Sequence, residues 1–184
     1  TSSDYFFIIQ PIEGLNMYDL AWGTASAKPV SVSFWVRSSL TGTFSGSLRN
    51  GPTESSRTTY PFSYTISSAN TWEYKTISIS GPTSGAWTIG DINAGLSLTF
   101  CFGSGSTRLG TAGSWQAGDL DGVTGTTSVV GTNGATFYIT GVQLEAGSVA
   151  TPFERRSYGQ ELALCQRYYQ QGKAWGYVLN DSAT

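Results

Sequence analysis

Apolar and polar residues alternate in short runs along the chain as far as about residue 145. Clusters of Gly, Ser, Thr and Pro separate these runs, which is the pattern of short β-strands joined by turns. Strands at such even spacing predict an all-β fold, an antiparallel β-sandwich. The predicted strands cover residues 5–9, 30–37, 43–50, 59–66, 74–80, 96–102 and 136–144.

The alternation also predicts which side of each strand faces the core. One side of strand 30–37 is apolar, and it carries Val30, Val32, Phe34 and Val36. A sheet with one apolar and one polar face is typical of antiparallel sandwiches. The polar side of this strand carries Ser31, Ser33, Trp35 and Arg37, and a similar polar row on strand 43–50 carries Ser45, Ser47 and Arg49.

The last predicted strand changes its period at Gly141. Phe137 and Ile139 share one parity, whereas Val142 and Leu144 share the other. A β-bulge at Gly141 would turn all four side chains toward the core. We therefore expect a bulge at this position.

Near the C-terminus the pattern changes to that of a helix over residues 157–169. Leu162, Cys165 and Tyr169 follow helical spacing, and Ser157 with Gln160 fits a capping box. We also expect a short helical turn over 14–20, a further strand over 173–180, and a long surface excursion over 103–134. The predicted organisation is a sandwich over 1–156, followed by a helix and a C-terminal strand over 157–184.

Composition excludes several classes of function. The chain has no histidine, and charged residues make up only 12% of it, with a net charge of −2. Histidine-dependent catalysis and zinc sites of the HExxH type are therefore excluded. An acidic balance also argues against binding nucleic acid, and no apolar run reaches the ~18–20 residues of a membrane-spanning helix. The first residue is Thr1 rather than Met, so we expect a processed chain or a fragment.

No motif points to catalysis or to a metal. Twelve carboxylates are scattered along the chain without a spacing that selects a pair, so we expect no catalytic residues and no enzyme activity. Asp119-Leu120-Asp121-Gly122 resembles the start of a calcium loop but lacks its closing Glu, and we interpret it as an acidic surface turn. We expect Cys101 and Cys165 to be free thiols.

The aromatic residues, 14% of the chain, carry the most informative chemistry. Carbohydrate-binding modules stack sugar rings on exposed aromatic side chains and bind the hydroxyl groups through polar neighbours, an amphipathic use of these side chains. For each aromatic candidate, packing within the protein is the alternative, and for Trp72, which precedes a strand, we expect core packing. The predicted carbohydrate-binding residues are Trp35, Arg37, Arg49, Trp87 and Trp115.

Three segments resemble a family of bacteriophage virion proteins, the tail-fibre or tail-associated proteins of phages of aquatic bacteria. They cover residues 28–50, 68–80 and 135–169, and the stretch from Ile12-Glu13-Gly14 to Trp22-Gly23-Thr24 is also typical of this family. The resemblance implies a non-catalytic protein of the virion that binds a glycan on the host cell. Its implied partners are that glycan, other virion proteins and further copies of this chain, most simply in a homotrimer.

The same family is distantly similar to carbohydrate-binding modules with a jelly-roll, galactose-binding-like sandwich. Such modules often hold a structural calcium ion with an Asp of the closing strand. Here that stretch reads Ile139-Thr140-Gly141-Val142, without an Asp, so we expect no calcium and no other cofactor. Two alternatives stay open: a capsid decoration or tail-assembly protein without a sugar ligand, and a carbohydrate-binding module of a polysaccharide-degrading enzyme.

Overall fold

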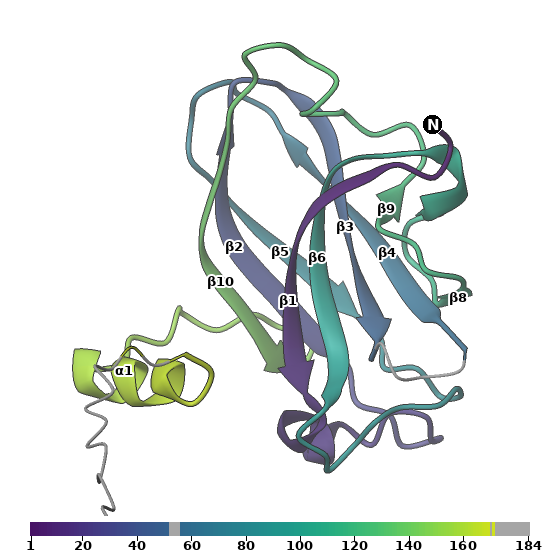
Figure 1. Ribbon diagram of the computed structural model, residues 1–184, viewed down its shortest axis with the longest axis vertical. Helices are drawn as coiled ribbons and strands as arrows, with labels where there is room; N and C mark the ends of the chain where they lie inside the picture. Colours follow the sequence, from purple (N-terminus) through teal and green to yellow (C-terminus); the bar gives the residue numbers. More distant parts are fainter. Residues whose placement is uncertain (52–55, 170, 172–184) are drawn as a thin grey trace, which may run out of the picture. The chain divides into compact units, whose positions relative to one another are not determined.

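The computed structural model describes residues 1–51, 56–169 and 171 of the chain (Figure 1). They belong to two compact units, Thr1–Phe153 and Glu154–Thr184. The first unit is a β-sandwich, and the second contains the short helix α1 (Tyr158–Gln166).

Two antiparallel sheets form the sandwich and face each other in Figure 1. The five-stranded sheet has the order β1-β6-β3-β4-β8, and the three-stranded sheet has the order β10-β2-β5. Consecutive strands repeatedly cross from one sheet to the other, and the predicted all-β, antiparallel sandwich is confirmed. The strands are β1 (Tyr5–Glu13), β2 (Val30–Ser38), β3 (Gly42–Asn50), β4 (Thr58–Ile66), β5 (Glu73–Ile79), β6 (Ala94–Ser104), β8 (Gln116–Ala117) and β10 (Phe137–Ala146), and a small parallel pair joins β7 (Leu109–Gly110) to β9 (Gly122–Val123).

The core lies between the apolar sides of the two sheets. Phe34 on β2 is fully buried, and its ring makes edge contacts with Phe100 at 4.9 Å and with Tyr64 at 5.0 Å. Val32 and Val36, two positions away on either side, are buried as well. The side-chain period of two in a strand thus places the predicted apolar row of β2 in the core.

The predicted bulge in β10 is present. Gly141 has a φ of 58°, and the register against β2 shifts between Thr140 and Gln143. Phe137, Ile139 and Leu144 pack against the core, but Val142 stays 39% exposed. The expectation that all four apolar side chains enter the core is therefore wrong for Val142, because β10 is an edge strand of its sheet and leaves this side chain at the open edge.

The helical predictions are also confirmed. A 3₁₀ helix, η1 (Gly14–Leu20), follows β1, and α1 begins where the Ser157 hydroxyl accepts a hydrogen bond from the backbone N–H of Gln160 at 3.4 Å. Both cysteines are free, with Cys101 buried and Cys165 exposed. The predicted strand over 173–180 lies outside the described residues. None of the helices described is long and apolar enough to span a bilayer.

Candidate functional site

The outer face of the five-stranded sheet is covered by the segment between β6 and β10. Figure 1 shows this segment returning over the sheet, where β9 contacts β3, β4 and β6. The Ser45 hydroxyl on β3 lies 3.2 Å from the Thr126 hydroxyl of the covering segment. Ser47, the next polar residue of the β3 row, is fully buried. The predicted surface excursion therefore covers the outer face of the five-stranded sheet. We call this covering segment, residues 105–136, the lid.

Arg49, the third member of that row, belongs to a buried ion-pair network under this segment. Its side chain pairs with Asp119 and lies 3.4 Å from Asp121, which is fully buried. Asp121 also accepts hydrogen bonds from Arg108 Nε at 2.6 Å and Nη2 at 2.9 Å, and these bonds raise the pKa of the Arg108 guanidinium above its ordinary value. The ring of Phe7 lies 5.5 Å from the Arg49 guanidinium.

This network corrects two expectations. Arg49 is only 7% exposed, and its guanidinium is held by carboxylates, so it is removed from the candidate carbohydrate-binding surface. Asp121 lies in a buried network rather than in an acidic surface turn, because its carboxylate neutralises Arg49 of β3 and Arg108 of the covering segment itself.

Trp87 and Trp115 are partly buried and pack against the core. Their rings lie 4.8 Å and 5.5 Å from the buried ring of Trp22, and 5.3 Å from each other, all in edge-to-face contact. The Trp115 indole N–H donates to the carbonyl of Ser80 at 2.7 Å. The expectation of exposed rings at Trp87 and Trp115 is wrong, because their loops fold back onto the core at Trp22.

The outer face of the three-stranded sheet, by contrast, carries exposed aromatic side chains. Trp35 on β2 is paired across the strands with Tyr74 on β5, and each is 44% exposed. Their ring centroids lie 5.4 Å apart. Beside them, the ring centroid of Tyr138 on β10 lies 6.4 Å from that of Trp72, which precedes β5 and is 42% exposed. The expectation that Trp72 packs in the core is wrong, because it shares the outward parity of Tyr74.

Arg37 completes this surface. It follows Trp35 on the outward side of β2, and its guanidinium lies 5.5 Å from the centre of the Tyr138 ring. We call the surface formed by Trp35, Arg37, Trp72, Tyr74 and Tyr138 the aromatic face. Sequence reasoning found Trp35 and Arg37 by alternation within one strand, but it missed Trp72, Tyr74 and Tyr138. The outward parity of Tyr74 and Tyr138 is visible in the sequence, whereas the register that brings β5 and β10 beside β2 is not.

Hydroxyl groups extend the aromatic face along the same strands. Thr76 and Ser78 continue the outward row of β5 and are exposed. Next to them, Ser31 on β2 is 1% exposed, and its hydroxyl has no hydrogen-bond partner in the described part of the chain. Ser31, Thr76, Ser78 and Ser148 line a cavity of about 330 Å³.

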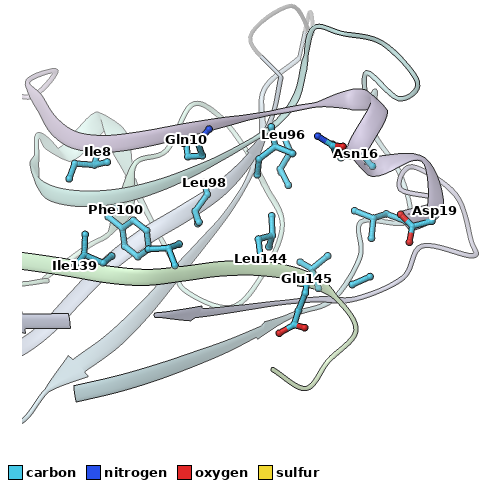
Figure 2. Close-up of a pocket in the computed structure, with 16 residues that line it drawn as sticks. Ile8, Gln10, Asn16, Asp19, Leu96, Leu98, Phe100, Ile139, Leu144 and Glu145 are labelled. Carbon is cyan, nitrogen blue, oxygen red and sulfur yellow. The ribbon is translucent and has the colours of Figure 1, made fainter. Parts of the chain in front are cut away.

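A second, larger groove of about 570 Å³ opens between β1 and β10, where the two sheets part (Figure 2). Its walls are apolar side chains such as Ile8, Leu98 and Leu144. Its polar side chains are Gln10 on β1, Asn16 and Asp19 on η1, and Glu145 near the end of β10. Two carboxylates, Asp19 and Glu145, border it. Figure 2 shows the Glu145 carboxylate turned away from the apolar walls, and hydrogen bonds from Thr151 lower the pKa of Glu145. A glycosidase needs one carboxyl group of raised pKa as its general acid, and Glu145 does not supply that acid.

The residues described include no group of three or more Cys, Asp or Glu side chains that could hold a metal ion. A scan against models of protein families, a search of curated proteins and a search of solved structures each found no match to this chain.

Proposed function

We propose that this protein is a non-catalytic, glycan-binding protein of a bacteriophage virion, a tail-fibre or tail-associated protein that attaches the particle to a glycan of the host cell. The observation that carries the glycan-binding proposal is the exposure of Trp35 and Tyr74 side by side on a β-sheet. Aromatic rings offer an apolar face to the C–H side of a sugar ring, and a neighbouring guanidinium donates hydrogen bonds to sugar oxygens. Arg37 supplies such donors at the edge of the rings.

The placement in a virion is supported by the sequence resemblance over residues 28–50, 68–80 and 135–169. A fibre of this kind is proposed to be a homotrimer, in which three copies of the aromatic face act together. Linked sites gain avidity of roughly 10²–10⁴ over a single site, so weak binding by each face is sufficient for attachment.

The second candidate function is a capsid decoration or tail-assembly protein. Trp, Tyr and Arg are the residue types that dominate binding energy at protein interfaces, and the aromatic face contains all three. In that case another virion protein covers the face. A carbohydrate-binding module of a polysaccharide-degrading enzyme would use the same face as the attachment protein, and a hydrolase domain in the same reading frame distinguishes it.

A glycan array tests the proposal. The full chain is applied to immobilised O-antigen and capsular oligosaccharides of bacteria, as wild type and as the double variant Trp35→Ala/Tyr74→Ala. We expect the wild type to bind and the double variant to lose at least ~30-fold in affinity, which corresponds to ~2 kcal/mol for a central aromatic anchor. Tyr18→Ala is the matched control, because Tyr18 is an aromatic side chain, 77% exposed, on η1. Absence of binding to any glycan and to host cells overturns the proposal, as does a double variant that binds like the wild type.

A further inference from the structure

We infer that the ligand of the aromatic face is an acidic oligosaccharide, which lies along β2 and β5 with an anionic substituent at Arg37 and neutral, hydroxyl-bearing sugar at Ser31. This inference rests on the proposed glycan-binding function and specifies its substrate class. The anionic substituent is a carboxylate or a phosphate ester, since both match the donors of a guanidinium in the same way.

The first observation is that the guanidinium of Arg37 has no anionic partner among the described residues. Its side chain has no ion pair and no hydrogen bond in the part of the chain that the structure describes, and its Nε is buried without an acceptor. Other arginines of the sandwich are engaged: Arg49 and Arg108 pair with aspartates, and Arg57 donates to backbone carbonyls. A half-buried guanidinium with unused donors is costly, and an anionic ligand would remove that cost.

Charges next to Arg37 do not neutralise it. Glu73 is the carboxylate of the neighbouring strand, paired in register with Val36. It accepts hydrogen bonds from Lys75 Nζ at 2.7 Å and from the backbone N–H groups of Ser67 and Ser68, each at 2.8 Å. Lys75 and Glu73 therefore neutralise each other, and the Arg37 end of the aromatic face keeps a positive charge.

The second observation lies at the other end of the same strand row. The Ser31 hydroxyl is buried, has no partner among the described residues and lines the cavity that Thr76, Ser78 and Ser148 also border. A sugar hydroxyl in this cavity would supply the missing hydrogen bond. Glu145 is paired in register with Ser31, so a negative charge already stands at this end. The acidic group of the ligand is therefore expected at Arg37 and not at Ser31.

The distance between the two ends sets the minimum size of the ligand. Ser31 and Arg37 are six residues apart on one strand, a span of roughly 20 Å. Trp35 and Tyr74 lie between them and offer rings for stacking. A single sugar ring cannot reach both ends, so the geometry points to an oligosaccharide.

The first test uses matched acidic glycans. Acidic capsular polysaccharides of bacteria are spotted intact, after reduction of their carboxylates to alcohols, and after removal of their phosphate esters. We expect wild type to bind the intact form about 10-fold more tightly than the form that has lost its anion, and the form affected identifies carboxylate or phosphate. We expect the Arg37→Gln variant to bind the intact glycan only as tightly as wild type binds the treated glycan. Added NaCl should weaken binding of the intact glycan by wild type, and this effect should be mostly lost in Arg37→Gln. Lys28→Gln, the same charge change at an exposed site, should leave affinity unchanged.

The second test addresses Ser31. We expect Ser31→Ala to weaken binding of the intact glycan by about 3- to 10-fold, because one hydrogen bond is lost. Ser47→Ala is the matched control: the Ser47 hydroxyl is equally buried and also has no partner in the part of the chain that the structure describes, but it lies under the segment that covers the other sheet. Equal affinity of Ser31→Ala and wild type overturns the placement along the strands.

The outcomes separate this inference from the proposed function. If wild type binds neutral and acidic glycans equally and Arg37→Gln has no effect, while Trp35→Ala/Tyr74→Ala still abolishes binding, the acidic ligand is overturned and glycan binding stands. If wild type binds no glycan at all, both fail.

Discussion

The outer faces of the two sheets begin from the same sequence pattern and end in opposite environments. Both central strands, β2 and β3, carry serines and an arginine at every second position. On β3 this row is buried, and Arg49 is paired with Asp119 and Asp121. On β2 the C-terminal half of the row is exposed to solvent, and there Trp35 and Arg37 contact the aromatic side chains of the neighbouring strands.

The difference comes from chain connectivity rather than from the strands themselves. The connection from β6 to β10 crosses the five-stranded sheet and brings Asp119 and Asp121 to Arg49 of β3, together with an arginine of its own, Arg108. Charged groups that lose water are costly without partners, and on the covered face Arg49 and Arg108 are paired with Asp119 and Asp121. The open face keeps contact with water, and its arginine has no such partner among the described residues. The alternation of apolar and polar residues therefore predicts which side of a strand is polar. It does not predict whether that side is exposed to solvent or covered by another segment of the chain.

Removal of the buried carboxylate on the covered face should have the largest effect. Asp121→Ala leaves Arg108 and Arg49 short of a partner in a dry site, and we expect the free energy of unfolding to fall by ~3–5 kcal/mol. Urea denaturation measures it. Asp119→Ala is the control, since that carboxylate is partly exposed and should cost ~1 kcal/mol. Arg37→Gln on the open face should stay within ~0.5 kcal/mol of wild type. Equal stability of Asp121→Ala and Arg37→Gln would contradict the contrast between the faces.

A pair of tryptophan variants sharpens the contrast. Trp115→Ala removes a ring that packs on Trp22, Trp87 and Tyr60, so the free energy of unfolding should fall by ~2–4 kcal/mol. Trp72→Ala on the aromatic face should cost ~1 kcal/mol or less, because that ring is nearly half exposed. Thermal and urea unfolding provide the comparison. The distinction between packing and surface tryptophans is refuted if Trp72→Ala is the more damaging change.

Substitution of Gly141, at the bulge of β10, should have a smaller effect on the free energy of unfolding. Gly141 has a positive φ, which an L-amino acid adopts at a cost of ~1 kcal/mol, so Gly141→Ala should lower the free energy of unfolding by about that amount. Asn tolerates this conformation better, and Gly141→Asn should recover part of the loss. An Ala variant as stable as wild type would show that the bulge does not need glycine.

The smallest expected effect concerns pH. Hydrogen bonds from Lys75 and from the backbone of Ser68 and Ser67 lower the pKa of Glu73 below its ordinary value. Stabilisation by this carboxylate is complete above its unfolded pKa, near 4.5, and is lost as pH falls through the lower folded pKa. Glu73→Gln should therefore reduce the fall in stability on acidification, by under ~1 kcal/mol because the group is near the surface. Urea unfolding between pH 6 and pH 3 measures the pH dependence of the free energy of unfolding. If this dependence is identical for wild type and Glu73→Gln, Glu73 does not contribute to the loss of stability in acid.

Sequence patterns predicted the sandwich, the position of every long strand, the bulge at Gly141 and the capped helix α1, because these depend on local period and local turn chemistry. They placed Trp35 and Arg37 on one outward row for the same reason. They failed for Arg49, Trp87 and Trp115, because burial of these side chains depends on a lid and loops that come from distant parts of the chain. They also failed for Trp72, since a position just before a strand does not reveal which side of the sheet the residue joins.

The indole N–H signals of the tryptophans in a ¹H–¹⁵N NMR spectrum report on both faces at once. Each signal is assigned by single Trp→Phe variants, and a bacterial capsular oligosaccharide that binds on the array is then titrated into the protein. If the aromatic face is the binding surface, the signals of Trp35 and Trp72 shift as oligosaccharide is added, until the site is saturated. The signals of Trp22, Trp87 and Trp115 then do not shift. Shifts at Trp87 and Trp115 with no change at Trp35 and Trp72 would contradict it.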